Sequence, residues 1–192
     1  MISLSSYRPE LFNRNADQGN LLVLTKQLQW RGVDFEVLHE FDLSADFVLI
    51  GDSFNAVRRE YSAELLELAP GLQSRLDQGK ATLLVGSSYE FYMDILDGLP
   101  NPVRAARVSE FRVAKSGSLS AFGYRNTDLD GSDLFIQGAF IGTALYGPVL
   151  AKSPDLLKLV LDAIGVETEL SSSFSGRLEN YLEQIIKTSI AD

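Results

Sequence analysis

Two short apolar runs, each followed at once by a glycine, constrain the fold of this chain more than any other feature. Phe47–Ile50 is apolar throughout and precedes Gly51, and Thr82–Val85 is nearly so and precedes Gly86. Segments without a polar face are typical of parallel strands that lie between two layers of helices. Helical periodicity alternates with these runs, as in Gly19–Arg31, where leucines recur at helical spacing. The alternation predicts an α/β fold with a mostly parallel sheet.

The second half of the chain has a different pattern, which predicts an antiparallel extension of the sheet. Ser116-Gly117 and Asp130-Gly131 are dipeptides of the tight-turn type that joins hairpin strands. Short strand candidates lie around these turns, at Val108–Val113, Leu119–Tyr124, Leu134–Ile136 and Phe140–Leu145.

Three longer segments are predicted to be helical. Ala56–Asp77 has helical tendency, and we expect Pro70-Gly71 to break or kink it. Ser153 is a favourable N-cap for a helix that has Pro154 at its first position. Arg177–Ile190 has an amphipathic pattern and is predicted to close the chain as a further helix.

Length and charge limit the domain organisation and the partners. No linker or low-complexity segment divides the sequence, so we expect a single domain over residues 1–192. The formal charge of −9 at pH 7 argues against nucleic acid and against an anionic membrane surface as partners. No apolar stretch approaches the roughly 18 residues that a transmembrane helix needs, and the N-terminus does not have the pattern of a signal peptide. The expected location is the cytoplasm.

Cysteine is absent from the sequence, and His39 is its one histidine. The absence of cysteine excludes disulfides, thiolate metal sites and every mechanism with a cysteine nucleophile. One histidine argues against a histidine-based zinc site and against a catalytic dyad that contains histidine. We therefore expect neither a metal nor a cofactor.

Four segments, in the same order along the chain, resemble motifs of one enzyme family, the class I glutamine amidotransferases of the CobB/CobQ-like type. The sequence is most similar to the GatD-type glutaminase subunit, which supplies ammonia to a Mur-ligase-like partner in lipid II amidation. The resemblance implies a flavodoxin-like fold over nearly the whole chain. The last segment, which resembles the family pattern G-T-Y-L-H-G-P-L-L-P-K-N-P, is the most specific. The four segments are Ala16–Gly32, Asp46–Gly51, Leu83–Glu90 and Gly142–Pro154.

In this family a cysteine attacks the glutamine amide, a histidine transfers protons, and a glycine-rich loop holds the oxyanion. The resemblance places Gly86 at the cysteine position and Tyr146 at the histidine position. A phenol, with an unperturbed pKa of about 10, is a poor base at neutral pH. The oxyanion loop corresponds to Gly51, Asp52 and Ser53, where the Asp52 carboxylate would oppose developing negative charge.

We therefore expect a protein of this family that has lost Cys-dependent glutaminase activity and acts as a binding or regulatory subunit. Its partner would be a Mur-ligase-like protein or an amidotransferase paralogue in the amidation of a cell-wall (peptidoglycan) precursor. Its ligand would be a small amide or carboxylate. The ligand-pocket candidates are Gly51, Asp52, Ser53, Ser87, Ser88, Tyr89 and Glu90. The partner-contact candidates are Asp17, Asn20 and Trp30.

The alternative is an active hydrolase or amidotransferase with a substitute nucleophile such as Ser87. A serine nucleophile needs a base within hydrogen-bond reach, and His39 is the sole imidazole. His39 lies in a segment far from the other motifs, and the Gly-x-Ser-x-Gly pattern of hydrolases is absent. The sequence therefore favours the inactive protein over the substitute enzyme.

Overall fold

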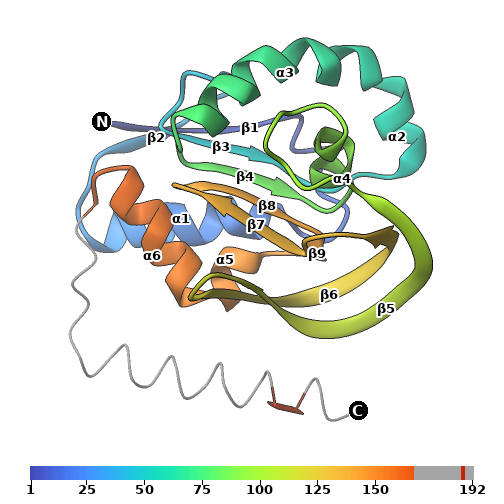
Figure 1. Cartoon of the computed structure of the whole chain (residues 1–192). Helices are drawn as coiled ribbons and strands as arrows, with labels where there is room; N and C mark the ends of the chain where they lie inside the picture. Colours follow the sequence, from blue (N-terminus) through green and yellow to red (C-terminus); the bar gives the residue numbers. More distant parts are fainter. Residues whose placement is uncertain (167–186, 189–192) are drawn as a thin grey trace.

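A central six-stranded sheet, in the order β2-β1-β3-β4-β8-β7, confirms the α/β fold (Figure 1). The structure is a computed structural model that describes residues 1–166 and 187–188. Strands β2, β1, β3, β4 and β8 run parallel, and β7 pairs antiparallel with β8 at one edge. The strand bounds are β1 (Ile2–Ser6), β2 (Phe35–Val37), β3 (Phe47–Ile50), β4 (Thr82–Val85), β7 (Leu134–Gln137) and β8 (Phe140–Thr143).

Helices cover both faces of this sheet (Figure 1). On one face lie α2 (Asn55–Glu60), α3 (Ser62–Asp77) and α4 (Ser87–Met93). On the other lie α1 (Gln18–Trp30), α5 (Val149–Lys152) and α6 (Pro154–Ala163). Among the described residues, no helix combines the length and the apolar character that crossing a bilayer requires.

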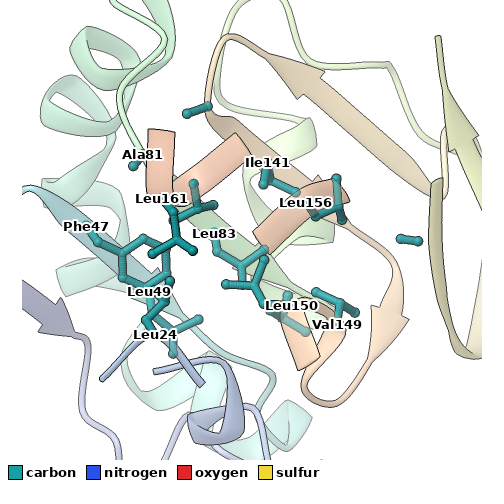
Figure 2. Close-up of a cluster of buried hydrophobic side chains, with 14 of the residues drawn as sticks. Leu24, Phe47, Leu49, Ala81, Leu83, Ile141, Val149, Leu150, Leu156 and Leu161 are labelled. Atoms are coloured by element: carbon teal, nitrogen blue, oxygen red, sulfur yellow. The ribbon is translucent and has the colours of Figure 1, made fainter. Parts of the chain in front are cut away.

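The two apolar runs are strands whose successive side chains enter two different cores. Leu49 and Leu83 point into the core beneath α1, α5 and α6, which Figure 2 shows. Ile50 and Leu84 point into the core beneath α3 and α4. All four side chains are fully buried. Each strand therefore has no face on which a polar side chain would meet water, and this is why its sequence is apolar without alternation.

A second, antiparallel sheet in the order β5-β6-β9 provides the predicted extension. It consists of β5 (Val103–Ser116), β6 (Leu119–Asp130) and β9 (Leu145–Tyr146). The predicted hairpin turn at Ser116-Gly117 is confirmed, with Gly117 at a φ of +60°. The predicted hairpin at Asp130-Gly131 is wrong, because the chain passes there from β6 into β7 of the other sheet. The single strand predicted at Phe140–Leu145 is divided into β8 and β9, which belong to different sheets.

Three further expectations have different outcomes. The predicted break at Pro70-Gly71 is wrong, because α3 continues through Pro70 and the helical segment is interrupted at Tyr61 instead. A proline inside a helix costs about 3 kcal/mol, and the buried leucines of α3 on both sides of it offset that cost.

The helix after Ser153 begins at Pro154 as predicted, but the Ser153 hydroxyl accepts a hydrogen bond from the Phe122 N–H and does not cap the helix. The helix predicted at 177–190 lies outside the described residues except for 187–188.

Candidate functional site

The turn between β4 and α4 reverses the chain at a single residue, Gly86. Its φ of +57° and ψ of −123° lie in a region that glycine adopts far more readily than other residues. The Gly86 N–H donates to the carbonyl oxygen of Thr143, 2.8 Å away on β8, and this fixes the turn to the sheet. Ser87 is already the first residue of α4. The strand, sharp turn and helix expected from the family resemblance are therefore centred on Gly86 and not on Ser87.

Segments far apart in the sequence converge on Gly86. A β-carbon at this position would lie 2.9 Å from Oδ1 of Asp52 and 2.9 Å from Cε1 of Tyr146. Both distances are shorter than β-carbons reach in proteins. The positions that the resemblance assigned to the nucleophile, the proton-transfer residue and the oxyanion loop are thus neighbours in space, and the space that a side chain at residue 86 would need is already filled.

The Asp52 carboxylate pairs with the backbone at the start of α4. Its Oδ1 accepts the Ser87 N–H at 2.9 Å, and its Oδ2 accepts the Asn15 side-chain amide at 2.7 Å. Asp52 is fully buried. In acyl-transfer enzymes with a turn of this kind, the N–H that follows the nucleophile helps to hold the oxyanion. In this protein the corresponding N–H, that of Ser87, already donates its hydrogen bond to the Asp52 carboxylate.

The two serines that follow the turn tie α4 to the loop after β3. Ser87 Oγ accepts the Ser53 N–H at 3.1 Å and donates to the Ser53 carbonyl at 3.3 Å. Ser88 Oγ donates to the Gly51 carbonyl at 2.6 Å. Neither hydroxyl donates to a group that could remove its proton. His39 is exposed and follows β2. Strand β2 lies three strands from β4 in the sheet, which is roughly 14 Å at the usual strand spacing. His39 is therefore too far from the two serines to take up a proton from either.

Tyr146 holds its proton firmly. Its hydroxyl donates to the Asn126 carbonyl at 2.7 Å. Burial, followed by the negative charges of Asp52 and Glu90, raises the pKa of Tyr146 to about 12. A group with this pKa is a protonated hydrogen-bond donor at neutral pH, and even less of it than of an ordinary phenol is deprotonated and able to accept a proton.

A cavity of about 260 Å³ opens beside the turn, next to the carboxyl ends of β3 and β4. This is the edge at which α/β sheets commonly bind ligands. Four of the predicted ligand-pocket residues line it, namely Asp52, Ser53, Ser87 and Glu90. The other three, Gly51, Ser88 and Tyr89, are buried and do not line it.

Sequence reasoning missed the most abundant residue type of this cavity, which is arginine. Arg58 and Arg59 belong to α2, which begins just after the loop that follows β3, and a basic pair at that edge is a signal that the sequence did offer. The exposed strand β5 and the loop before α1 contain no pattern that marks their arginines. The cavity is lined by Arg14, Arg58, Arg59, Arg104 and Arg107.

The structure places the three partner-contact candidates in different surroundings. Asp17 and Asn20 are fully buried, so their side chains offer no surface to a partner. Asp17 Oδ2 accepts the Asp52 N–H at 3.0 Å, and Asn20 Oδ1 accepts the Leu150 N–H at 2.9 Å. Both therefore join elements inside the molecule. Trp30, at the end of α1, is 69% exposed and remains a candidate.

We expect Asp17 to make the stability of the protein fall as the pH rises from about 4 to about 7. Burial raises the pKa of Asp17 from its ordinary 3.8 to about 6. The folded chain thus binds this proton more tightly than the unfolded chain, so the stabilisation is complete below the unfolded pKa and is lost as the pH rises through the folded pKa. The loss amounts to about 2 kcal/mol.

Urea unfolding of the wild type and of Asp17→Asn, between pH 4 and pH 7, measures this effect. Asparagine does not ionise, so the variant should lack the part of the pH dependence that belongs to Asp17. Curves of unfolding free energy against pH that run parallel for the two proteins would contradict the assignment.

The described part of the chain contains no group of three or more His, Cys, Asp or Glu side chains that could hold a metal ion.

No family model and no curated protein matches this sequence. Among solved structures, the chain is similar to the crystal structure of a glutamine amidotransferase from Thermotoga maritima. The TM-score is 0.52 and the sequence identity 12%, over 100% of this chain and 96% of that one. The similarity shows that the chain has a glutamine amidotransferase-like fold, with a mainly parallel sheet and added antiparallel strands.

Proposed function

We propose that this protein does not hydrolyse glutamine and acts as a binding or regulatory subunit with a glutamine amidotransferase-like fold. The observation that supports this most directly is the hydrogen bond from the Ser87 N–H to the Asp52 carboxylate. Stabilisation of an oxyanion needs a donor aimed at the place where negative charge develops. Here that donor is paired with a full negative charge of the protein, and Gly86 supplies no nucleophile.

A serine enzyme centred on Ser87 has no comparable support. The Ser87 hydroxyl donates to a backbone carbonyl, and that carbonyl cannot act as a base. Tyr146, at the position that the resemblance assigns to proton transfer, has a pKa raised to about 12 by burial. Activation of a serine requires an adjacent group that accepts its proton.

We infer the partner and the pathway from the resemblance of the sequence motifs alone. The resemblance to CobB/CobQ-like proteins, and to the GatD type in particular, supports a Mur-ligase-like protein or an amidotransferase paralogue as partner. Amidation of a peptidoglycan precursor in the cytoplasm is the corresponding role. Trp30 is a surface residue that such a partner could cover, because large aromatic side chains are frequent anchors of interfaces. A pull-down from the native host that recovers no ligase-like or amidotransferase protein would contradict this assignment.

A glutaminase assay tests the loss of activity. At high protein concentration the wild type is expected to release glutamate no faster than glutamine hydrolyses without protein. Gly86→Cys is expected to be equally inactive, because its side chain would meet Asp52 and Tyr146 and because the Ser87 N–H remains paired.

Ser87→Ala is the matched control in the same assay. If the wild type hydrolyses glutamine and Ser87→Ala does not, while both have the same circular dichroism spectrum, the protein is a serine enzyme and the proposal is wrong.

A further inference from the structure

The cavity beside Gly86 concentrates positive charge in an acidic protein. Five of the seventeen lysines and arginines of the chain line this one cavity, although the formal charge of the whole is −9. Every residue that lines it is polar or charged. The five arginines come from the loop before α1, from α2 and from β5. A cavity of this composition suits a hydrophilic anion and has no wall for an apolar ligand.

Most of these guanidinium groups have no carboxylate partner. Arg104 pairs with Asp128 at 2.7 Å. In the part of the chain that the structure describes, the other four arginines of the cavity form no ion pair. A guanidinium has five N–H donors in a planar fork that matches the oxygens of a phosphate. The unpaired groups are therefore available to an anionic ligand.

Local contacts orient several of these groups without using up their donors. Arg107 Nε donates to Asn126 Oδ1 at 2.8 Å. Arg58 Nη1 donates to the Ser87 carbonyl at 3.2 Å. The Arg14 guanidinium lies 4.6 Å from the centre of the Phe54 ring, and such contacts between cation and ring are favourable. The arginines are thus partly positioned before any ligand arrives, which lowers the entropic cost of binding.

An irregularity in β5 brings two arginines to the same cavity. In a regular strand, side chains three residues apart point to opposite faces. The pairing of β5 with β6 shifts register between Arg104 and Val108, and Arg107 lies within this shift. Bulges of this kind are common next to binding sites, where they redirect a side chain. As a result Arg104 and Arg107 both line the cavity.

A buried hydroxyl with no partner also lines the cavity. Ser53 is 1% exposed, and its Oγ has no hydrogen-bond partner among the described residues. A buried polar group that is left unpaired costs about 1–3 kcal/mol. A ligand oxygen that accepts a hydrogen bond from the Ser53 hydroxyl would remove this energetic cost. Three acidic residues, Asp52, Glu90 and Asp128, also line the cavity, so its five arginines leave an excess of basic side chains.

We propose that this cavity binds a compact ligand with two linked phosphate groups, held by the arginines of α2, β5 and the loop before α1. The proposal rests on the proposed function in one respect, namely that the cavity is a ligand-binding site. A volume of about 260 Å³ is near the lower end of the range of small-molecule pockets, about 300–1,000 Å³. It therefore suits a diphosphate better than a large ligand.

Isothermal titration calorimetry with inorganic pyrophosphate, at one fixed ionic strength, tests this inference on the full chain. Pyrophosphate is expected to bind at least about tenfold more tightly than orthophosphate or citrate. Arg59→Gln and Arg107→Gln should each weaken pyrophosphate binding by about tenfold, which corresponds to the loss of one charged hydrogen bond. Both residues are exposed, so neither substitution should disturb the fold.

Lys115→Gln is the matched control, because Lys115 is an exposed cation on the same strand β5 and does not line the cavity. It should bind pyrophosphate as the wild type does. An equal loss of affinity in Lys115→Gln, no heat of binding with pyrophosphate, or tighter binding of citrate would each overturn the proposal.

Glutamine turnover measured on the same preparations separates the two proposals. Turnover together with pyrophosphate binding that depends on Arg59 and Arg107 overturns the proposed function and leaves the phosphate site standing. Absence of both turnover and binding overturns the phosphate site alone.

Discussion

Replacing Arg75 with methionine is expected to lower the free energy of unfolding by about 4 kcal/mol. Arg75 belongs to α3 and is 3% exposed. Its guanidinium lies among the residues that precede β3 and β4 and holds the amino ends of the two strands together. Each buried acceptor left without a partner costs about 1–3 kcal/mol, and methionine leaves several. The acceptors are the carbonyls of Leu43, Ala45, Asp46 and Ala81 and the hydroxyl of Thr82.

Urea unfolding followed by circular dichroism measures this loss. Arg75→Lys should be intermediate, because an ammonium keeps the charge but has three donors instead of five. Lys80→Met removes a cation that is exposed and close in sequence, and it should change the unfolding free energy by less than about 0.5 kcal/mol. A loss below about 1 kcal/mol in Arg75→Met would show that water replaces the guanidinium.

Replacing Gly51 with alanine is expected to lower the free energy of unfolding by about 3 kcal/mol or to prevent folding. A β-carbon at Gly51 would lie 2.2 Å from the carbonyl oxygen of Phe12 and 2.9 Å from Cβ of Asp17. Phe12 and Asp17 are fully buried, so neither can move aside without disturbing its own neighbours. Overpacking of this kind typically costs about 1–3 kcal/mol, and contact with backbone is the unfavourable extreme.

Gly131→Ala provides the comparison for Gly51→Ala. The neighbour that its β-carbon would meet is the end of the flexible Met93 side chain, at 3.2 Å. This variant should lose less than about 1 kcal/mol, in the same unfolding experiment. Equal unfolding free energies for Gly51→Ala and Gly131→Ala would contradict the close packing described for the loop after β3 against the chain near Phe12.

The parts of the fold that the sequence predicted well are those where burial leaves a pattern. The bounds of β3 and β4 agree with the predicted Phe47–Ile50 and Thr82–Val85, because both faces of each strand are buried. The predictions failed where packing outweighs a local preference, as at Pro70, which α3 includes. They also failed where the chain moves between sheets, because a turn dipeptide such as Asp130-Gly131 does not determine which strand follows as a partner.

The candidate site, like the fold, could be predicted from the sequence only in part. The family resemblance indicated Gly86, Tyr146 and Asp52, and the structure places Asp52 and Tyr146 around the space that a β-carbon at Gly86 would occupy. The hydrogen bond between Asp52 and the Ser87 N–H depends on how two loops meet, and no spacing in the sequence encodes that geometry. The arginine Arg107 could not be found either, because the exposed start of β5 has no periodicity and its irregular register appears only in the paired strands.

The crowding around Gly86 restricts the order in which substitutions can accumulate. While Asp52 and Tyr146 are present, any side chain at residue 86 meets both of them and must also adopt a positive φ. A mutation that introduces a side chain there therefore damages packing, whatever chemistry the new group could offer. Such a change fits only after smaller residues have replaced Asp52 and Tyr146. Those replacements would first break the hydrogen bond from the Ser87 N–H to Asp52 and the one from Tyr146 to the Asn126 carbonyl. Introducing a side chain at residue 86 must therefore pass through less stable intermediates, so substitutions around this turn accumulate more easily in one order than in another.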